Sequence, residues 1–103
     1  MMIDLKLKNK KIILTGGSRG IGLSILEKLY ALGSEVLIIG SNQENLDKVK
    51  KKYAGIHAIQ FNLNDHSKLA EMFKDATGML GGVDVLINNA GITKDNLAIR
   101  MSK

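Results

Sequence analysis

The sequence predicts an α/β fold, with an open, doubly wound parallel sheet. Short apolar runs alternate with helical stripes along the chain, and a glycine-rich turn joins the first run to the first stripe. Short strands that alternate with helices of this length imply right-handed crossovers and a parallel sheet. The part of the sheet that is present is predicted to have the strand order 3-2-1-4. The length of 103 residues allows one small domain.

Four segments are predicted to be strands. Lys11 to Thr15 and Glu35 to Ile39 are short apolar runs, typical of strands that are buried on both faces. His57 to Leu63 alternates more between apolar and polar residues and is the third candidate. Val83 to Asn88 is the fourth.

Between these segments, apolar residues recur at helical spacing. The stripes are Ile21, Ile25 and Leu29, then Leu46, Val49 and Tyr53, then Leu69, Met72, Phe73, Ala76 and Leu80. Gly33 and the pair Gly81-Gly82 are predicted to end the first and third helices. The chain therefore has strand and helix three times in succession, followed by a strand.

The composition excludes several classes of protein. With 45% hydrophobic and 24% charged residues, the chain has an ordinary globular profile. It has no apolar run long enough to span a membrane, and its Lys-rich start lacks the apolar core of a signal peptide. Without cysteine it has no disulfide or thiolate metal site, and His57 and His66 alone do not favour zinc. We expect a cytoplasmic protein without a metal site.

The net charge of +5 comes largely from two lysine clusters, Lys6, Lys8, Lys10 and Lys11, and Lys48, Lys50, Lys51 and Lys52. Such clusters either attract an anionic partner or form solvated faces, and solvated faces are the favoured interpretation. Two Tyr and two Phe are too few for a base-stacking surface, so we expect no nucleic-acid binding.

The segment Thr15 to Gly22 carries the strongest chemical signal, because its glycines lie between a strand and a helix. Such a turn lets backbone N–H groups approach an anion at the positive end of the helix dipole. Gly16 is predicted to permit the turn, Gly20 the approach of a pyrophosphate, and Gly22 the packing of helix on strand. The alternative is a purely structural turn. The G-x-x-x-G-x-G spacing lacks the G-K-[ST] ending of an NTPase loop.

The end of the second predicted strand indicates which dinucleotide is bound. An NAD site has an acidic residue there to accept from the ribose 2′-OH, but this chain has Gly40, Ser41 and Asn42. Its first acid, Glu44, lies in the next helix. Arg19 in the glycine loop can instead reach a 2′-phosphate, which favours NADP(H). Arg19 as a plain solvent-exposed residue is the alternative.

The fourth predicted strand ends in Asn88, Asn89, Ala90 and Gly91. In an open α/β sheet, ligands bind beyond the carboxyl ends of the strands, where the strand order reverses. For the order 3-2-1-4 that crevice lies between the first and fourth strands. The glycine loop and Asn88 to Gly91 should therefore face one ligand, with Asn side chains that satisfy loop backbone groups. Taken alone, the second segment could be a structural turn.

These residues resemble a known family. Thr15 to Gly22 resembles the TGxxxGxG motif of short-chain dehydrogenases/reductases, and Asn88 to Gly91 resembles their NNAG motif. Gly91 to Leu97, with Arg100 and Met101, closely resembles bacterial 3-oxoacyl-[acyl-carrier-protein] reductases. The resemblance implies a Rossmann-type sheet. It spans essentially the whole chain, but only roughly the N-terminal 40% of a typical member.

The resemblance implies a set of cofactor-binding residues: Gly16, Gly17, Ser18, Arg19, Ile21, Ser41, Asn62, Leu63, Asn89, Ala90 and Gly91. The first four would hold the adenosine ribose, its 2′-phosphate and part of the pyrophosphate. Ser41 would touch the 2′-phosphate. Ile21 would approach the pyrophosphate and the nicotinamide through its backbone. Asn62 and Leu63 would contact adenine, although the family more commonly has Asp at the first position. The last three would line the adenosine and ribose side, and whether Asn88 or Asn89 faces the ligand stays open.

The catalytic residues of the family have no counterpart in this chain. Members reduce a ketone with a Tyr acid, a Lys four residues later that lowers its pKa, and a Ser that orients the carbonyl. Tyr53 is followed four residues later by His57, and Tyr30 by Ser34, so no Y-x-x-x-K occurs. In similar proteins the catalytic Asn, Ser, Tyr and Lys lie beyond Lys103. The fourth strand should then be a bare sheet edge, which invites aggregation.

We therefore expect residues 1–103 to be the NADP-binding N-terminal portion of a single Rossmann-type domain whose catalytic C-terminal portion is absent. The implied function is NADPH-dependent reduction of 3-oxoacyl-[acyl-carrier-protein] in type II fatty acid biosynthesis. The chain alone should be inactive, the acyl carrier protein is the expected partner, and the full-length protein is expected to be a homotetramer. The alternatives are another short-chain reductase, acting on sugars, steroids or polyols, and a non-catalytic nucleotide-binding remnant.

Overall fold

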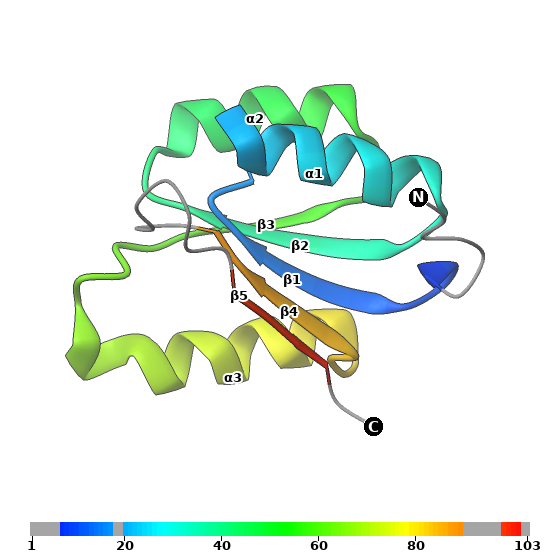
Figure 1. The fold of residues 1–103 in the computed structure, drawn as a ribbon. Helices are drawn as coiled ribbons and strands as arrows, with labels where there is room; N and C mark the ends of the chain where they lie inside the picture. Colours follow the sequence, from blue (N-terminus) through cyan, green and yellow to red (C-terminus); the bar gives the residue numbers. More distant parts are fainter. Residues whose placement is uncertain (1–6, 18–19, 90–97, 102–103) are drawn as a thin grey trace.

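The computed structural model describes residues 7–17, 20–89 and 98–101. Its α-helices and strands are β1 Lys11–Thr15, α1 Gly20–Ala31, β2 Glu35–Gly40, α2 Gln43–Lys52, β3 His57–Gln60, α3 Leu69–Leu80, β4 Val85–Asn88 and β5 Ala98–Met101, and a short 3-10 helix, His66–Lys68, precedes α3. They form three layers, with α1 and α2 on one face of the sheet and α3 on the other (Figure 1). The predicted doubly wound α/β architecture is confirmed.

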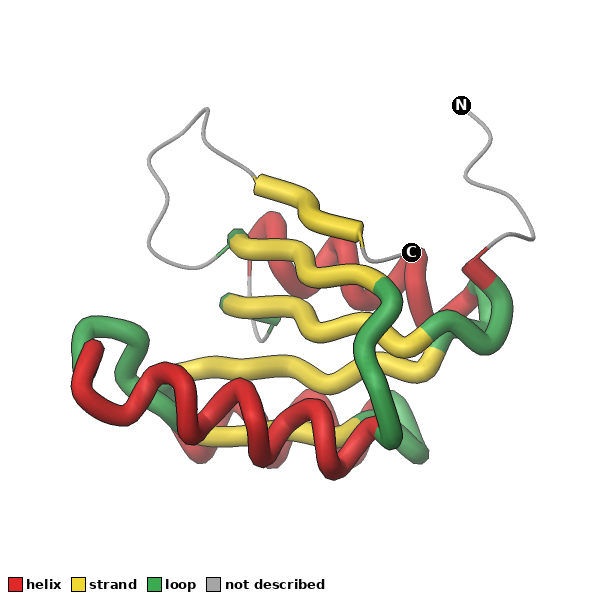
Figure 2. Tube along the Cα trace, turned by 90° about the horizontal axis from the view of Figure 1, so that it is seen from below, coloured by secondary structure: helices red, strands yellow, loops and turns green. Residues whose placement is uncertain are grey.

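The sheet has the strand order β3-β2-β1-β4-β5. The first four strands of that order are parallel, as predicted. β5 pairs antiparallel with β4 and lies at the outer edge of the sheet (Figure 2). The expectation of a bare β4 edge was wrong, because β5 supplies backbone partners for that edge.

The third strand is shorter than predicted. It ends at Gln60 instead of Leu63, and the backbone N–H of Phe61 makes the last bond to β2, to the carbonyl oxygen of Gly40 at 2.9 Å. Asn62 then turns the chain, because its side-chain oxygen accepts from the backbone N–H of Asn64 at 2.9 Å. This local side-chain bond replaces a strand ladder.

The fourth strand begins at Val85 instead of Val83. Just before it, Asp84 and Lys11 exchange two hydrogen bonds. The backbone N–H of Asp84 donates to the carbonyl oxygen of Lys11 at 2.7 Å, and the backbone N–H of Lys11 donates to the Asp84 carboxylate at 2.8 Å. A carboxylate thus replaces one backbone acceptor where β4 joins β1.

The core on the α1 and α2 side confirms most of the predicted stripes. Leu46, Val49 and Tyr53 of the second stripe are all buried there against β1 and β2. The first stripe is partly wrong, because Ile21 is 65% exposed and Leu26 is fully buried. The buried face of α1 is set by its docking on the sheet, which a four-residue spacing alone does not define.

On the other face α3 buries Met72, Ala76 and Leu80 against β1 and β2, while Leu69 and Phe73 are partly buried. All five belong to the predicted stripe. Helix ends also follow the prediction. Gly33 follows α1 with a φ of +83°, and Gly81 caps α3 with a φ of +78°, the left-handed conformation that favours glycine.

Candidate functional site

The carboxyl ends of β1 and β4 lie side by side in the middle of the sheet, where the strand order reverses. Thr15 at the end of β1 pairs in register with Asn88 at the end of β4. The next residues on the two chains are Gly16, which starts the glycine loop, and Asn89. The predicted meeting of these two segments at one crevice is therefore confirmed for their described residues.

The buried Thr15 side chain connects the two strand ends. Its hydroxyl donates to the side-chain oxygen of Asn88 at 3.0 Å and accepts from the backbone N–H of Asn89 at 2.8 Å. Thr15 is only 1% exposed, so the loss of these partners would leave buried polar groups unpaired. A single hydroxyl thus fixes how the chain leaves β4.

Asn89 also holds the glycine loop directly. Its side-chain amide donates to the carbonyl oxygen of Gly16 at 3.3 Å. Asn88 is exposed, and its side chain contacts Thr15 instead of the loop. Asn89 is therefore the asparagine that supports the glycine loop, as expected for side chains that satisfy loop backbone groups.

The glycine positions differ in the space around them. Gly16 turns the chain with a φ of +72°. Among the described residues, a Cβ on Gly20, at the start of α1, would meet nothing within 4 Å, whereas one on Gly22 would lie 1.7 Å from the carbonyl oxygen of Gly16. Gly17 is buried, and a Cβ there would lie 2.6 Å from Ile38. Gly20 therefore leaves open space at the start of α1, while Gly17 and Gly22 keep the loop close to the sheet.

The electrostatics at the start of α1 favour an anion. The first turn of this twelve-residue helix contains no acidic residue, and Gly20 and Ile21 there are both exposed. Free N–H groups and the helix dipole give such a helix start a positive partial charge. A phosphate group fits this position.

Three further predicted site residues, Ser41, Asn62 and Leu63, lie at the same edge of the sheet. Ser41 is exposed after β2, and its carbonyl oxygen accepts from the Gln60 side chain at 3.0 Å. Asn62 is exposed after β3, and Leu63 is partly buried against the α3-side core. Ser18, Arg19, Ala90 and Gly91 were also predicted, and these four lie outside the described residues.

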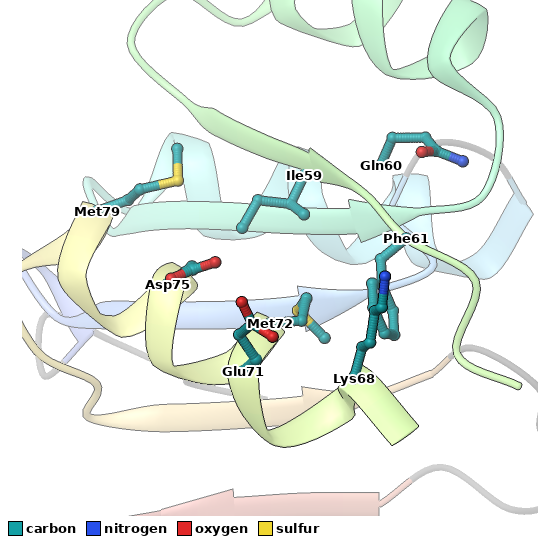
Figure 3. Close-up of a pocket in the computed structure, with 8 residues that line it drawn as sticks. All are labelled: Ile59, Gln60, Phe61, Lys68, Glu71, Met72, Asp75 and Met79. Carbon is teal, nitrogen blue, oxygen red and sulfur yellow. The ribbon is translucent and has the colours of Figure 1, made fainter. Parts of the chain in front are cut away.

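Two cavities lie on the α3 side. One of about 320 Å³ is beside the crevice, between the ends of β1 and β4 and the start of α3, and is lined by Thr15, Leu63, Leu69, Phe73, Leu86 and Asn88, with Asn64 at its side. The other, of about 390 Å³, lies between the edge strand β3 and α3 (Figure 3). Ile59, Phe61 and Met72 form its apolar part, with Lys68, Glu71 and Asp75 around it. This second cavity is away from the glycine loop, so the crevice remains the candidate site.

Five lysines of the two clusters lie at the opposite edge of the sheet. Lys10 and Lys11 stand at the start of β1, and Lys50, Lys51 and Lys52 form the last turn of α2, which leads to the start of β3. Cations at a helix C-terminus are stabilised by the helix dipole. A five-residue strand spans about 16 Å, so these lysines do not border the crevice.

Neither a metal cluster nor a membrane helix occurs in the described parts of the chain. No three His, Asp or Glu side chains gather as metal ligands there. No described helix has the length and apolar character needed to cross a membrane.

Two features of the site were not predicted from the sequence. Gln60 reaches across from β3 to Ser41. Asn42 caps α2, with its side-chain oxygen accepting from the backbone N–H of Asn45 at 2.9 Å. The cap could have been predicted, because Asn is a preferred N-cap residue. The Gln60 contact depends on strand register and could not.

Comparison with known proteins agrees with this geometry. A family model described as short chain dehydrogenase matches residues 10–103. The chain is 37% identical over 105 residues to the 3-oxoacyl-[acyl-carrier-protein] reductase FabG of Aquifex aeolicus, covering 97% of this chain and 42% of that protein. It is 36% identical over 91 residues to the uncharacterized oxidoreductase DltE of Bacillus subtilis, covering 88% of this chain and 36% of that protein.

A solved structure, titled as that of Cj0485 dehydrogenase, superposes with a TM-score of 0.74 at 32% identity, covering 91% of this chain and 36% of that one. The chain thus spans about two fifths of the length of the relatives it matches. The family match covers nearly every residue, including the glycine loop and the Asn88-Asn89 segment. The chain therefore belongs to the short-chain dehydrogenase family.

Proposed function

We propose that the protein carrying this chain is an oxidoreductase that reduces 3-oxoacyl-[acyl-carrier-protein] to 3-hydroxyacyl-[acyl-carrier-protein] with NADPH. In this proposal the chain supplies the adenosine and pyrophosphate half of the cofactor site. The observation that carries it is the junction at the ends of β1 and β4, where Asn89 holds the Gly16 carbonyl beside an α1 start without acidic residues. This is an anion-binding arrangement at the switch point of the sheet.

The described residues fit a dinucleotide. The open space at Gly20 admits a pyrophosphate close to the start of α1. The absence of a side chain at Gly22 lets the Gly16 carbonyl lie close to α1, which keeps the loop out of the way of the pyrophosphate. In the proposed site Gly16, Gly17 and Ile21 face the pyrophosphate, and Ser18 and Arg19 complete the loop. Asn62 and Leu63 lie toward adenine, with Asn89, Ala90 and Gly91 along the adenosine and ribose.

The preference for NADPH over NADH rests on the end of β2. Ser41 and Asn42 stand where an NAD site would have a carboxylate, and Glu44 belongs to α2. A serine hydroxyl and an arginine guanidinium are suitable partners for a 2′-phosphate, whereas a carboxylate would repel it. Arg19 and Ser41 are therefore proposed as the residues that select NADP(H).

The cofactor, when bound, supplies the hydride for carbonyl reduction, and this chain's residues orient it. No residue of the chain is assigned a catalytic role, because the sequence contains no Y-x-x-x-K. The intact mass of the natural gene product tests the proposal that this chain binds the cofactor and that the catalytic residues belong to another part of the protein. A mass well above 11.2 kDa, with NADPH-dependent ketoacyl reduction, supports the proposal, whereas a natural product of 11.2 kDa favours a nucleotide-binding remnant.

Replacing Arg19 tests the cofactor assignment. Arg19→Ala should raise the Kd for NADPH much more than the Kd for NADH, because only NADPH carries the 2′-phosphate. Titration of both cofactors against the full-length protein, followed by nicotinamide fluorescence, measures the two constants. An equal loss of affinity for NADPH and for NADH would contradict the 2′-phosphate assignment.

The substrate part of the proposal comes from similarity to 3-oxoacyl-[acyl-carrier-protein] reductases, with 37% identity to the Aquifex protein. The nearly equal identity to an uncharacterized oxidoreductase, at 36%, makes another short-chain reductase the second candidate. Turnover of a 3-oxoacyl thioester, compared with sugar, steroid and polyol ketones, distinguishes them. Homotetramer formation stays a prediction, which light scattering of the full-length protein checks.

The acyl carrier protein is the proposed partner as substrate carrier. Its thioester must reach the crevice at the carboxyl edge of the sheet, whereas Lys10, Lys11 and Lys50 to Lys52 lie at the other edge. These lysines therefore lend no support to that partner. Charge reversal at Lys50 to Lys52 should leave the KM for the carrier-bound substrate within about twofold, as expected for solvated lysines.

A further inference from the structure

We propose that Gln60 is a positioning residue for the 2′-phosphate part of the cofactor site and acts through the Ser41 carbonyl. The proposal rests on the NADP(H) preference proposed above and adds a residue that selects the cofactor without touching it. Gln60 lies on β3, whereas the turn it holds follows β2. The observation behind it is one side-chain bond between neighbouring strand ends.

The bond joins two exposed segments. Ser41 and Asn42 form the turn between β2 and α2, and both are exposed. Gln60 is the last residue of β3 and pairs in register with Gly40, the last residue of β2. From there its side-chain amide donates to the carbonyl oxygen of Ser41 at 3.0 Å.

Strand alternation explains why Gln60 can reach the turn. Side chains two residues apart on a strand point to the same face. Ala58 packs into the core on the α1 and α2 side, whereas Ile59 packs on the α3 side. Gln60 shares the face of Ala58, which is the face on which Ser41 leads into α2.

Holding the Ser41 carbonyl also directs the next N–H group. In a trans peptide the C=O and N–H groups point in opposite directions, and none of the described peptide bonds is cis. The bond from Gln60 therefore turns the Asn42 N–H away from β3. The Asn42 side chain fixes the other end of the turn by accepting from the Asn45 N–H at 2.9 Å.

The two bonds together preorganise the turn for a phosphate. Ser41 offers its hydroxyl, Asn42 offers an N–H at the start of a ten-residue helix, and no carboxylate occurs in the turn itself. Backbone donors that are already oriented bind an anion without the cost of ordering the loop. Without Gln60 the Ser41 peptide can rotate, and its carbonyl oxygen can face the phosphate and repel it.

Gln60→Met tests this role, because methionine has a similar length and no donor. The matched control is Gln43→Met, which removes another exposed side-chain amide from the same region. In the described structure the Gln43 side chain donates to Asp47 at 2.9 Å and not to the Ser41 carbonyl. The probes are 2′,5′-ADP (adenosine 2′,5′-bisphosphate) and 5′-AMP, which differ only in the 2′-phosphate, titrated calorimetrically against the full-length protein.

We expect wild type to bind 2′,5′-ADP more tightly than 5′-AMP. In Gln60→Met this preference should fall by about threefold to tenfold, the effect of one hydrogen bond, while the Kd for 5′-AMP and the melting temperature stay unchanged. In Gln43→Met the preference should stay within about twofold of wild type.

Three other results overturn the proposal. An unchanged preference in Gln60→Met, or an equal loss for both probes, shows that Gln60 has no 2′-phosphate role. An equal fall in Gln43→Met shows a general effect of removing an amide near α2. A wild-type protein without any preference refutes the NADP(H) assignment itself, and thus separates failure of the proposed function from failure of the Gln60 role.

Discussion

The contact between Gly22 and the glycine loop gives the sharpest prediction. Gly22 lies in the first turn of α1, and a Cβ there would be 1.7 Å from the carbonyl oxygen of Gly16, 2.6 Å from its carbonyl carbon and 2.7 Å from the side-chain nitrogen of Asn89. Real Cβ atoms essentially never approach closer than 3.0 Å, so the loop must move by 3.0 − 1.7 = 1.3 Å. Two of these three atoms are backbone and cannot rotate away.

Gly22→Ala should therefore destabilise the fold. Overpacking costs about 3 kcal/mol at the upper end of its usual range, and the better helix propensity of alanine returns about 1 kcal/mol. The expected net loss is about 2 kcal/mol. In a full-length protein of the length of the relatives, of which this chain spans about two fifths, that corresponds to a fall in melting temperature of about 4–8 °C. The displaced loop should also weaken 2′,5′-ADP binding by tenfold or more, since a shift of about 1 Å at a site can cost 10²-fold.

Gly78→Ala is the matched control. Gly78 is exposed in α3, and a Cβ there would meet nothing within 4 Å. This variant should gain about 1 kcal/mol from helix propensity alone and, in the full-length protein, melt about 2–4 °C higher. Thermal unfolding followed by circular dichroism measures both variants. If Gly22→Ala were as stable as wild type, or shifted in the same direction as Gly78→Ala, the proposed close contact would be refuted.

Three further predictions concern single hydrogen bonds or ion pairs, each measured by urea unfolding. Thr15→Val should lower the free energy of unfolding by about 1–3 kcal/mol, because two polar groups at the end of β4 lose a buried partner. Thr15→Ser keeps the hydroxyl and should retain most of the wild-type stability. A loss below about 0.5 kcal/mol in Thr15→Val, roughly the size of a surface effect, would contradict this. Asn42→Ala should lower the free energy of unfolding by about 1 kcal/mol, because the side-chain cap on the Asn45 N–H is lost. Asn42→Asp keeps a side-chain oxygen at this position and should not lower it. Glu35→Gln should change stability by less than about 1 kcal/mol, since the Lys11–Glu35 pair at 3.3 Å is solvent-exposed; a larger loss would show that the pair is coupled to the sheet.

Much of the fold could be predicted because local signals agree with the global arrangement. The apolar run from Glu35 to Ile39, the helix-ending Gly33 and the glycine loop each define their element within a few residues. Strands linked by helical crossovers then leave few possible topologies. The crevice between β1 and β4 follows from the strand order, since ligands bind where that order reverses.

The boundaries and the exposed face of α1 were decided by contacts that local patterns do not encode. Asn62 ends β3 early through a bond to the Asn64 N–H, and Ile21 is exposed because α1 docks on the sheet through Leu26 instead. β5 was not predicted, because its pairing with β4 depends on a free sheet edge and not on its own sequence.

The fold class, the glycine loop, the family resemblance and the absence of a Y-x-x-x-K motif are properties of neighbouring residues, so the sequence alone was sufficient to predict them. The groups that hold the site together could be found only in the folded chain. The bonds of Thr15 with Asn88 and Asn89 join residues 73 and 74 positions apart, and the Gln60 bond to Ser41 joins residues 19 apart. These partners meet because the registers of β1 with β4 and of β2 with β3 align the strand ends, and register is set by packing of the whole sheet.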